Sequence, residues 1–375
     1  MSPAAPSSLE STLPQLLSAF GPPGRESGVR SVLRRLLRGS GPFHEDATGN
    51  LHVRRAGPGR RLLLAAHMDA PGVIVTRMEP DRGQARIAVL GGRKPSELVG
   101  ALTRFEDDRT AIVTWERKDG ADPEADQLLL ETGLGKPVRG GSPSRARAGS
   151  GAAVRLEVGE VAALDERPTR MGDYWCAANL DNRAGCAALV HALMRGRRLS
   201  YDVHAVFTAQ SDLGARGATT GAYGIEPELA VVVDVATWSE PKETSGFTPG
   251  QGPCVALKEQ GFLAHPEMLE LVRKAARAAR VPLQYLIREG EGSDARAVRA
   301  ARTGVPTAVI AIPARRSGGV WSLMHARDLA QTADLLAAIL AGSGDAKGRG
   351  TGGRAKRTRA KSRTKQRTTK RGGRR

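Results

Sequence analysis

The sequence predicts an α/β fold in which helices cover a mixed sheet, with a small β-rich insert and a disordered basic C-terminal tail. From residue 181 onward, unbroken apolar runs alternate with amphipathic segments, as expected for buried strands between helices. Residues 72–166 lack helical periodicity and consist of short apolar pieces separated by Pro, Gly and Arg. Residues 347–375 hold 14 Lys and Arg and no acid, so most of the net charge of +18 lies in this tail.

Residues 1–71 are expected to form the first part of the larger domain. Apolar spacing predicts two helices within residues 8–38, interrupted at Gly21-Pro22-Pro23-Gly24. The continuous apolar run at residues 62–66 predicts a strand that is buried on both faces.

Residues 72–166 are expected to form the β-rich insert. Its predicted strands lie at residues 73–75, 85–90, 111–115 and 154–158. The sequence RGGSPSRARAGSG at residues 139–151 is rich in Gly, Ser and Arg and predicts a mobile loop.

Residues 167–341 are expected to complete the larger domain. The predicted strands lie at residues 202–209, 229–233 and 307–312. The predicted helices lie at residues 184–195, 266–280, 293–302 and 328–340. Residues 342–375 then form the tail, which we expect to be disordered because of its dense like charge.

Composition excludes several classes of protein. No apolar run approaches the ~18 residues needed to cross a bilayer, and no basic residue precedes Arg25 as a secretory signal would require. The three cysteines show no CxxC spacing and cannot form a disulfide framework. These features predict a soluble protein of the cytoplasm with no membrane contact. A GxSxG motif, the mark of an α/β-hydrolase nucleophile, is also absent from the sequence.

Acids and histidines follow the predicted strands at the edge where open α/β sheets bind ligands. The residues at this edge, or in loops next to it, are His67, Asp69, Asp181, Ser211, Asp212, Asp234 and His325. A lone Asp at a strand end is most often a cap or turn residue, and a lone His is most often a surface residue. Their joint placement favours a divalent metal site instead, and imidazole with carboxylate suits Zn²⁺ or Co²⁺.

The stretches around these residues resemble the glutamyl aminopeptidase and tetrahedral (TET) aminopeptidase family of co-catalytic metallopeptidases. The matching stretches, in family order, are AAHMDAPGVIV (65–75), NLDNRAGCAALV (179–190), VFTAQSDLGARGA (206–218), VVVDV (231–235), GPCVAL (252–257), VPLQYLIREGEGSDA (281–295) and GVPTAVIAIP (304–313). Together they span most of residues 8–341.

The resemblance implies a zinc-aminopeptidase-like fold with two divalent metal ions, Zn²⁺ or Co²⁺, bridged by Asp181. His67 and Asp234 would complete one ion site, and Asp212 and His325 would complete the other. The implied reaction removes the N-terminal residue of a peptide by means of water activated by the two metals. The family's β-rich insert is a lid and dimerisation domain, so the resemblance also implies a homo-oligomer.

Three departures from the family pattern bear on activity. Ser211 and Asp212 stand where the family has two glutamates, the first being the general base and the second a metal ligand. A serine hydroxyl is no useful base at pH 7, and loss of a general base costs ~10²–10⁴ in rate. The segment from Pro313 to His325 is longer than in the family, and residues 91–98 lack a histidine that is common there. Asp69, by contrast, matches the carboxylate that orients the imidazole of His67.

Three functions therefore stay open. The first is a metallo-aminopeptidase with an altered base, either Asp212 or a second water. The second is a non-catalytic aminopeptidase-fold protein that acts in binding or assembly. The third is a hydrolase of another substrate, because a two-metal site does not by itself select peptide bonds. Residues 347–375 have no aromatic residue among their charges, which favours sequence-independent attachment to nucleic acid or another polyanion, or else a solvated extension.

Overall fold

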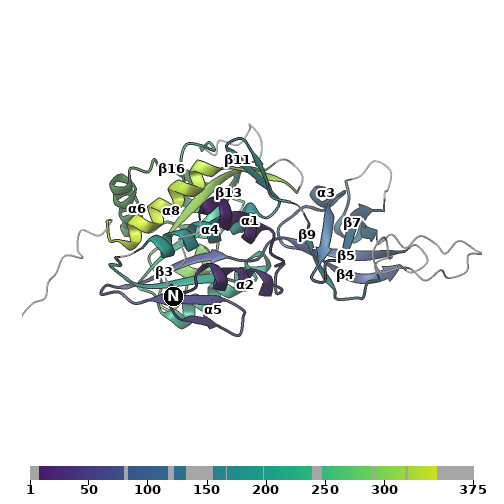
Figure 1. The fold of residues 1–375 in the computed structure, drawn as a ribbon, viewed down its shortest axis with the longest axis horizontal. Coiled ribbons are helices and arrows are strands. Elements are labelled where there is room, and N and C mark those ends of the chain that lie inside the picture. Colours follow the sequence, from purple (N-terminus) through teal and green to yellow (C-terminus); the bar gives the residue numbers. More distant parts are fainter. Residues whose placement is uncertain are drawn as a thin grey trace, which may run out of the picture.

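The structure, a computed structural model, describes residues 8–79, 83–116, 122–131, 155–165, 167–196, 198–238, 247–290, 292–316 and 320–343. A larger body of sheet and helices lies beside a smaller body built from strands (Figure 1). The predicted α/β class with a β-rich insert is confirmed. The predicted loop at 139–151 and the basic tail at 347–375 lie outside the described residues.

Four parallel strands form the centre of the large sheet. In spatial order they are β12 (Asp202–Thr208), β3 (Arg61–His67), β13 (Leu229–Trp238) and β17 (Thr307–Arg316). Their Leu, Val, Ile and Ala runs are buried on both faces, so the predicted strands at 62–66, 202–209, 229–233 and 307–312 are confirmed. Because the strands are parallel, their carboxyl ends lie at one edge of the sheet.

The sheet continues on both sides through shorter strands that the sequence did not predict. Beyond β12 these are β2 (Leu51–Arg55) and β1 (Phe43–Glu45). Beyond β17 these are β18 (Ser322–His325), β11 (Tyr174–Ala177) and β10 (Thr169–Met171). A branch from β17 consists of β14 (Cys254–Glu259), β15 (Phe262–Leu263) and β16 (Gln284–Ile287). These segments are too short, or too polar on one face, to form apolar runs.

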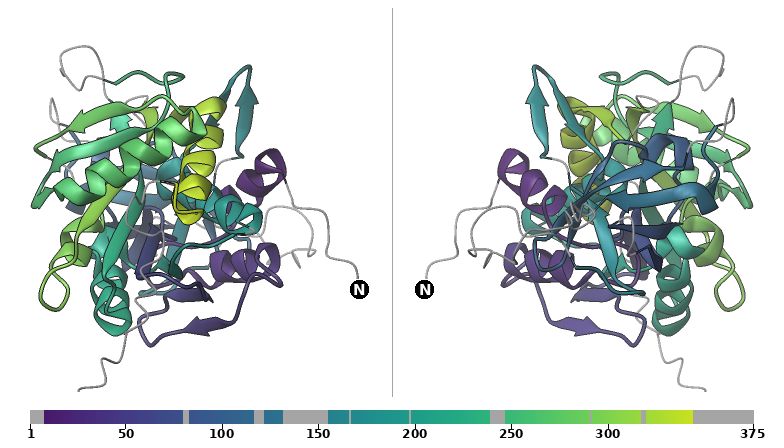
Figure 2. Two further views of the ribbon diagram at one scale, coloured as in Figure 1. Left: turned by 90° about the vertical axis from the view of Figure 1, so that its left-hand side faces the viewer. Right: turned by 90° about the vertical axis from the view of Figure 1, so that its right-hand side faces the viewer.

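Helices cover both faces of the sheet (Figure 2). One core contains α1 (Leu9–Leu17), α2 (Ser27–Leu36), α4 (Leu180–Arg195), α6 (Pro266–Ala279) and α8 (Ala326–Leu340). The other contains α5 (Arg216–Ile225) and the short α7 (Ala295–Arg299). Along β3, Leu62 and Leu64 point into the first core while Leu63 and Ala65 point into the second. This alternation explains why the run at 62–66 is apolar without a break.

The insert closes into a barrel with its own core. In spatial order its strands are β4 (Gly72–Glu79), β5 (Gln84–Leu90), β8 (Leu128–Glu131), β7 (Thr110–Trp115), β6 (Leu102–Phe105) and β9 (Val161–Leu164). The helix α3 (Pro95–Leu98) and the short 3₁₀ turn η2 (Ala125–Gln127) lie between these strands in the chain.

The strand predicted at residues 154–158 is wrong. Residue 154 lies outside the described residues, and residues 155–158 do not join a strand. Val158 is 64% exposed and precedes Gly159, whose φ of +92° makes a turn that side-chain-bearing residues disfavour. The strand begins only at Val161, where pairing with β4 and β6 starts.

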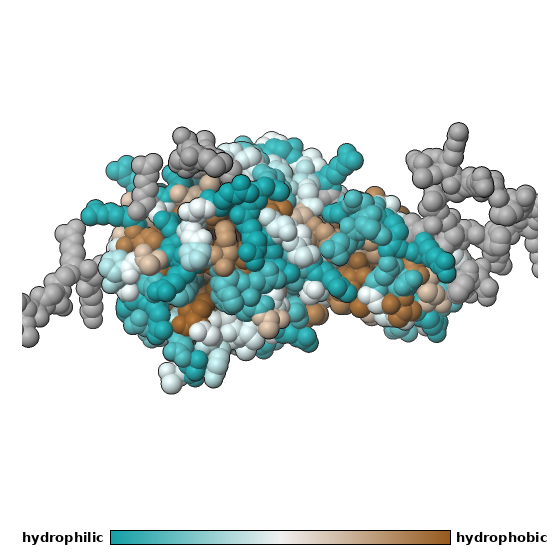
Figure 3. All heavy atoms as spheres, turned by 60° about the horizontal axis from the view of Figure 1, so that its bottom comes forward, coloured by the Kyte–Doolittle hydropathy of each residue, from teal (hydrophilic) through white to brown (hydrophobic). Residues whose placement is uncertain are grey.

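The face drawn in Figure 3 is mainly hydrophilic, with separate hydrophobic patches. Within the ranges that the structure describes, no helix combines the length and apolar character that a membrane span requires.

Candidate metal centre

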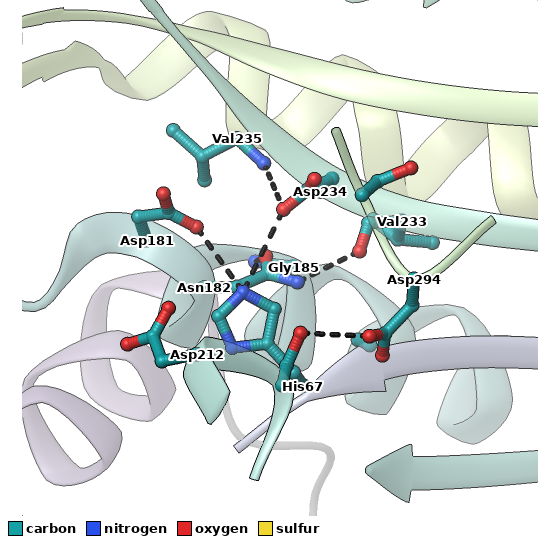
Figure 4. A network of polar contacts seen from close by, with 12 residues as sticks. His67, Asp181, Asn182, Gly185, Asp212, Val233, Asp234, Val235 and Asp294 are labelled. Atoms are coloured by element: carbon teal, nitrogen blue, oxygen red, sulfur yellow. Dashed lines mark hydrogen bonds and ion pairs between the residues drawn. The ribbon is translucent and has the colours of Figure 1, made fainter. Parts of the chain in front are cut away.

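Three of the predicted ligands lie together at the carboxyl edge of the sheet. They are His67 at the end of β3, Asp181 at the start of α4 and Asp234 in β13 (Figure 4). One ligand atom from each lies within 4.8 Å of the others. Nε2 of His67 is 3.3 Å from Oδ1 of Asp181 and 3.7 Å from Oδ1 of Asp234.

Strand register explains why His67 meets Asp234. Ala65 pairs with Val232 across the parallel strands β3 and β13, and both side chains enter the same core. His67 and Asp234 come two residues later, and a period of two returns each side chain to that same face. The side chains of His67 and Asp234 therefore meet where the apolar run of each strand ends.

Asp181 is held beside β13 by the next residue. Nδ2 of Asn182 donates a hydrogen bond of 2.8 Å to the carbonyl of Val233, and its Oδ1 accepts one of 3.1 Å from the N–H of Gly185. The peptide bond between Asp181 and Asn182 is cis. Asn182 thus caps the regular part of α4 and ties its start to the strand that carries Asp234.

The imidazole of His67 is oriented by Asp69. Its Nδ1 lies 3.1 Å from the backbone oxygen of Asp69 and 3.4 Å from that residue's carboxylate. Acceptors on this side favour a proton on Nδ1, which leaves the lone pair of Nε2 directed at the two carboxylates. The Asp69 carboxylate also accepts hydrogen bonds from the backbone N–H groups of Ser211 (3.0 Å) and Asp212 (2.8 Å). One buried side chain therefore positions both the histidine and the loop after β12.

Asp234 is fixed by a chain of ion pairs. Its Oδ1 accepts from the N–H of Val235 at 2.9 Å, and its Oδ2 lies 3.5 Å from the guanidinium of Arg288. Arg288 is paired in turn with the buried Glu259 at 2.7 Å, whose carboxylate also accepts from the hydroxyl of Ser293 at 2.6 Å. These contacts leave the Asp234 carboxylate little freedom to turn away from His67.

The charges of the site are only partly compensated by the protein. Burial, together with the nearby Asp181, raises the pKa of Asp234 well above its usual value. Burial and the neighbouring Asp69 raise the pKa of Asp212 to about 8. Burial opposes protonation of His67, yet its contacts with Asp181 and Asp69 raise its pKa above the usual value. The raised pKa values of Asp212 and Asp234, beside a histidine that binds a proton, mark a site that favours a cation.

Ser211 and Asp212 lie next to the cluster, in the 3₁₀ turn η3 (Ser211–Leu213) that follows β12. The Ser211 hydroxyl donates a hydrogen bond of 2.7 Å to Oδ1 of the buried Asp294. Oδ2 of Asp212 is buried and accepts no hydrogen bond from the described part of the chain. Asp212 lies outside the set of three whose ligand atoms are within 4.8 Å of one another.

His325 lies apart from the cluster, as the residue before α8. Its Nδ1 accepts a hydrogen bond of 3.1 Å from the N–H of Arg327, and its ring packs edge-on against Tyr174 with centroids 4.9 Å apart. A Cβ on Gly250 would come within 3.0 Å of this ring. The structure therefore brings together His67, Asp181 and Asp234, places Asp212 nearby, and gives His325 other contacts.

A cavity of about 520 Å³ opens over the cluster. Besides the predicted residues it is lined by four cationic side chains, namely Arg93, Lys94, Arg288 and Arg316. Arg93, Lys94 and Arg316 were not predicted from the sequence, whereas Arg288 and Asp294 lie in the stretch 281–295, whose end the resemblance places near the substrate. Arg93 lies within residues 91–98, where the comparison with the family pattern showed only a missing histidine. Asp294 directly precedes a helix, so a capping role is the ordinary expectation for it. No local pattern marks a charged residue that becomes important only through the folding of a distant segment.

Comparisons with known proteins agree with this architecture. Residues 147–335 match the sequence model of the M42 glutamyl aminopeptidase family. A lysyl aminopeptidase from Pyrococcus furiosus is 26% identical over 329 residues, covering 84% of this chain and 91% of that protein. An aminopeptidase structure from the archaeon Desulfurococcus kamchatkensis is 25% identical with a TM-score of 0.79, covering 89% of this chain and 94% of that one.

A TET1 peptidase from Pyrococcus horikoshii, which can assemble into a tetrahedron or a large octahedral shell, has the same fold. It is 20% identical with a TM-score of 0.75 and covers 89% of this chain and 99% of that one. The family match extends over half of the chain, and the similar structures cover both the sheet and the barrel. The chain belongs to the M42 glutamyl aminopeptidase family.

Proposed function

We propose that this protein is a metal-dependent aminopeptidase that hydrolyses the N-terminal residue of peptides. The observation that carries the proposal is the convergence of His67, Asp181 and Asp234 at the floor of a cavity, in a chain of this family. One imidazole and two carboxylates form a donor set that suits Zn²⁺ or Co²⁺.

Two further observations support a cation at this place. Oδ1 of Asp181 is buried and accepts no hydrogen bond from the described residues, so it has an unused lone pair beside Nε2 of His67. The pKa of Asp234 is raised by burial and by Asp181, a cost that a bound cation would offset. The residues present therefore fit a first ion, held by His67, Asp181 and Asp234.

A divalent ion bound there would polarise a peptide carbonyl and lower the pKa of a water molecule. The chain's own residues supply the geometry. Asp69 keeps Nε2 of His67 directed at the site through its contacts with Nδ1. Arg288 restrains Asp234 from the opposite side. Asp212, whose pKa is raised to about 8, is the carboxyl next to the cavity that can take up a proton near neutral pH.

We propose that turnover is slow because Ser211 occupies the position of the family's general base. Its hydroxyl donates a hydrogen bond to Asp294 and offers no basic group to an attacking water. The absence of a base typically costs ~10²–10⁴ in rate. Catalysis then relies on Asp212 or on a second water.

The remaining sequence-based expectations are part of the same proposal. Residues 1–71 and 167–341 form the catalytic domain, and residues 72–166 act as a lid and dimerisation insert. The shell-forming TET1 peptidase with this fold supports a homo-oligomer, whose size we do not assign. We place the protein in the cytoplasm, and the tail at 347–375 would attach it to nucleic acid or another polyanion.

Hydrolysis of aminoacyl p-nitroanilides by the full chain tests the proposal. Chelator-treated protein should be inactive, and Zn²⁺ or Co²⁺ should restore turnover with any of a panel of N-terminal residues. Added metal should not restore activity to the His67→Ala variant. Arg195 is exposed and pairs with Asp334 far from the cavity, so the Arg195→Ala variant should behave like the parent. Metal binding without turnover of any peptide substrate would instead identify a non-catalytic binding protein, and turnover of a different hydrolase substrate would identify the third function.

A further inference from the structure

The wall of the cavity on the barrel side is cationic. Arg93 lies in the loop between β5 and α3, Lys94 follows it, and Arg316 ends β17. The cavity also contains Asp181 and Asp212, and the charges of both carboxylates act on Arg93. Arg316 likewise acts on Asp181. Positive groups of the protein thus lie next to the acids that would have to hold a second ion.

The guanidinium groups of Arg93 and Arg316 both have partners in the protein. Arg93 is 8% exposed and donates hydrogen bonds to the backbone oxygens of Ala178 (3.1 Å) and Val320 (3.2 Å). Glu97 lies between the pair, with one oxygen 3.8 Å from Arg93 and the other 4.0 Å from Arg316. The buried guanidinium of Arg93, with its fixed partners, keeps its charge and cannot swing away to admit a metal ion.

Among the residues that the structure describes, few ligands for a second ion lie at the same place. His325 makes its contacts with Arg327, Tyr174 and Gly250 and does not line the cavity. Besides the shared Asp181, this leaves Asp212 as the one family-position ligand near the cluster among the described residues. A second dication would therefore have too few donors among these residues and would meet the positive charges of Arg93 and Arg316, a repulsion of several kcal/mol at an effective dielectric constant of about 20.

We infer that the chain binds one divalent ion, at His67, Asp181 and Asp234, and that Arg93 and Arg316 supply the positive charge that a second ion would bring beside Asp212. The inference rests on the proposed metal dependence and changes its stoichiometry. A guanidinium group can donate hydrogen bonds to a carbonyl or carboxylate oxygen of a peptide, but it cannot coordinate a water molecule. The arginine side of the cavity then orients substrate, and the single ion supplies the only metal-based activation of water.

Zn²⁺ content of the purified full chain tests the stoichiometry. Metal-free protein is loaded with excess Zn²⁺, desalted and analysed by inductively coupled plasma mass spectrometry and by native mass spectrometry. We expect one ion per chain, one ion in His325→Ala and in Asp212→Asn, and none in His67→Ala. Two ions per chain would overturn the inference while leaving the metal dependence intact. No ion in the parent chain would overturn the proposed function itself.

Calorimetric titration with Zn²⁺ tests the role of the arginines. Arg316→Gln removes one positive charge near Asp181, so Zn²⁺ should bind about tenfold or more tightly than in the parent. Arg195→Gln is the matched control on the exposed face of α4 and should not change the affinity. Circular dichroism establishes that each variant is folded, and Arg93→Gln provides a second variant should Arg316→Gln unfold. Unchanged Zn²⁺ affinity in a folded Arg316→Gln or Arg93→Gln chain would overturn the inference that these arginines supply the positive charge beside Asp212.

Discussion

The hydroxyl Oγ of Ser211 donates a hydrogen bond of 2.7 Å to Oδ1 of Asp294. The other oxygen of Asp294 accepts a hydrogen bond of 2.6 Å from the hydroxyl of Thr208. Burial raises the pKa of Asp294, and these two donors counteract that effect. Ser211, which lines the cavity, is therefore part of a polar network with the buried Thr208 and Asp294, and its proton is engaged by Asp294.

Ser211→Glu should raise peptidase activity by at least tenfold, because it restores a carboxylate at the general-base position. The neighbouring Asp294 would raise the pKa of the new glutamate toward neutrality, which suits a base. The measurement is kcat on aminoacyl p-nitroanilides with saturating Zn²⁺ or Co²⁺. Ser211→Ala is the control and should change kcat by less than about threefold. No gain in a Ser211→Glu chain that contains its metal would count against this model of the site.

Zn²⁺ should stabilise the folded chain through His67. At free Zn²⁺ of 100 times Kd, binding adds about 2.7 kcal/mol to the free energy of unfolding. A thermal shift assay should therefore show a higher Tm with Zn²⁺ for the parent chain and for His325→Ala. His67→Ala should show no shift. Equal shifts in the two histidine variants would place the ion elsewhere.

Arg183 should be among the most sensitive positions of the fold. It is 1% exposed and donates to the backbone oxygens of Leu16 (2.8 Å), Ala19 (3.1 Å) and Gly21 (3.1 Å), while burial lowers its pKa to about 10. Arg183→Met would leave these acceptors without their donor and should cost about 3 kcal/mol or more in urea denaturation. Arg195→Met, in the same helix but exposed, should cost less than about 1 kcal/mol. Similar losses in both variants would contradict this role.

Asp46 should stabilise the turn before β2 in a pH-dependent way. Burial alone would raise its pKa, but hydrogen bonds from His52, Asn50 and the turn backbone hold its pKa below the usual value. A depressed folded-state pKa means that the stabilisation is present above the unfolded value of 3.8 and is lost as pH falls through the folded value. Asp46→Asn should therefore lower the free energy of unfolding by about 1 kcal/mol at pH 7, a small effect because solvent screens this partly exposed site. The difference should shrink progressively below about pH 4.

Urea denaturation of the parent and Asp46→Asn chains at pH 7, 5 and 3.5 measures this difference. A gap in stability that stays constant over this range would show that the ionised carboxylate is not what the turn requires.

The basic tail should bind polyanions by charge alone. A chain that ends at Ser343 should lose most of its affinity for DNA and RNA, and the binding of the full chain should weaken steeply with salt. Fluorescence anisotropy with labelled duplexes of unrelated sequence at 50 and 200 mM salt gives the comparison. Equal affinity of the two chains would refute the prediction.

The sequence predicted the parts of the fold that depend on continuous apolar burial. The strands that contain Leu62–Ala66 and Leu229–Val233 are apolar on both faces, and that pattern needs no knowledge of partners. Strands such as Phe43–Glu45 and Tyr174–Ala177 exist because a neighbour offers a free edge, which no local pattern encodes. Val158 shows the opposite case, where local alternation predicted a strand but a turn at Gly159 removed it.

The candidate site likewise contains residues that the sequence predicted and residues that it did not. His67 and Asp234 were predictable because parallel strands align their carboxyl ends, and the register of β3 and β13 then brings the two side chains together. The length of the segment from Pro313 to His325 indicated a departure from the family, but the path of the chain there, and the contacts of His325 with Tyr174 and Arg327, could not be predicted. Arg93 reaches the site through the packing of the barrel against the sheet, a relation between distant segments.

Arg93 is one of the residues that connect the two bodies, because it extends from the loop after β5 and donates hydrogen bonds to the carbonyl groups of Ala178 and Val320. The barrel is thus no detachable module. Removing the barrel, or placing it on another protein, would separate the positive charge of Arg93 from the acids of the cavity and would remove part of the cavity wall.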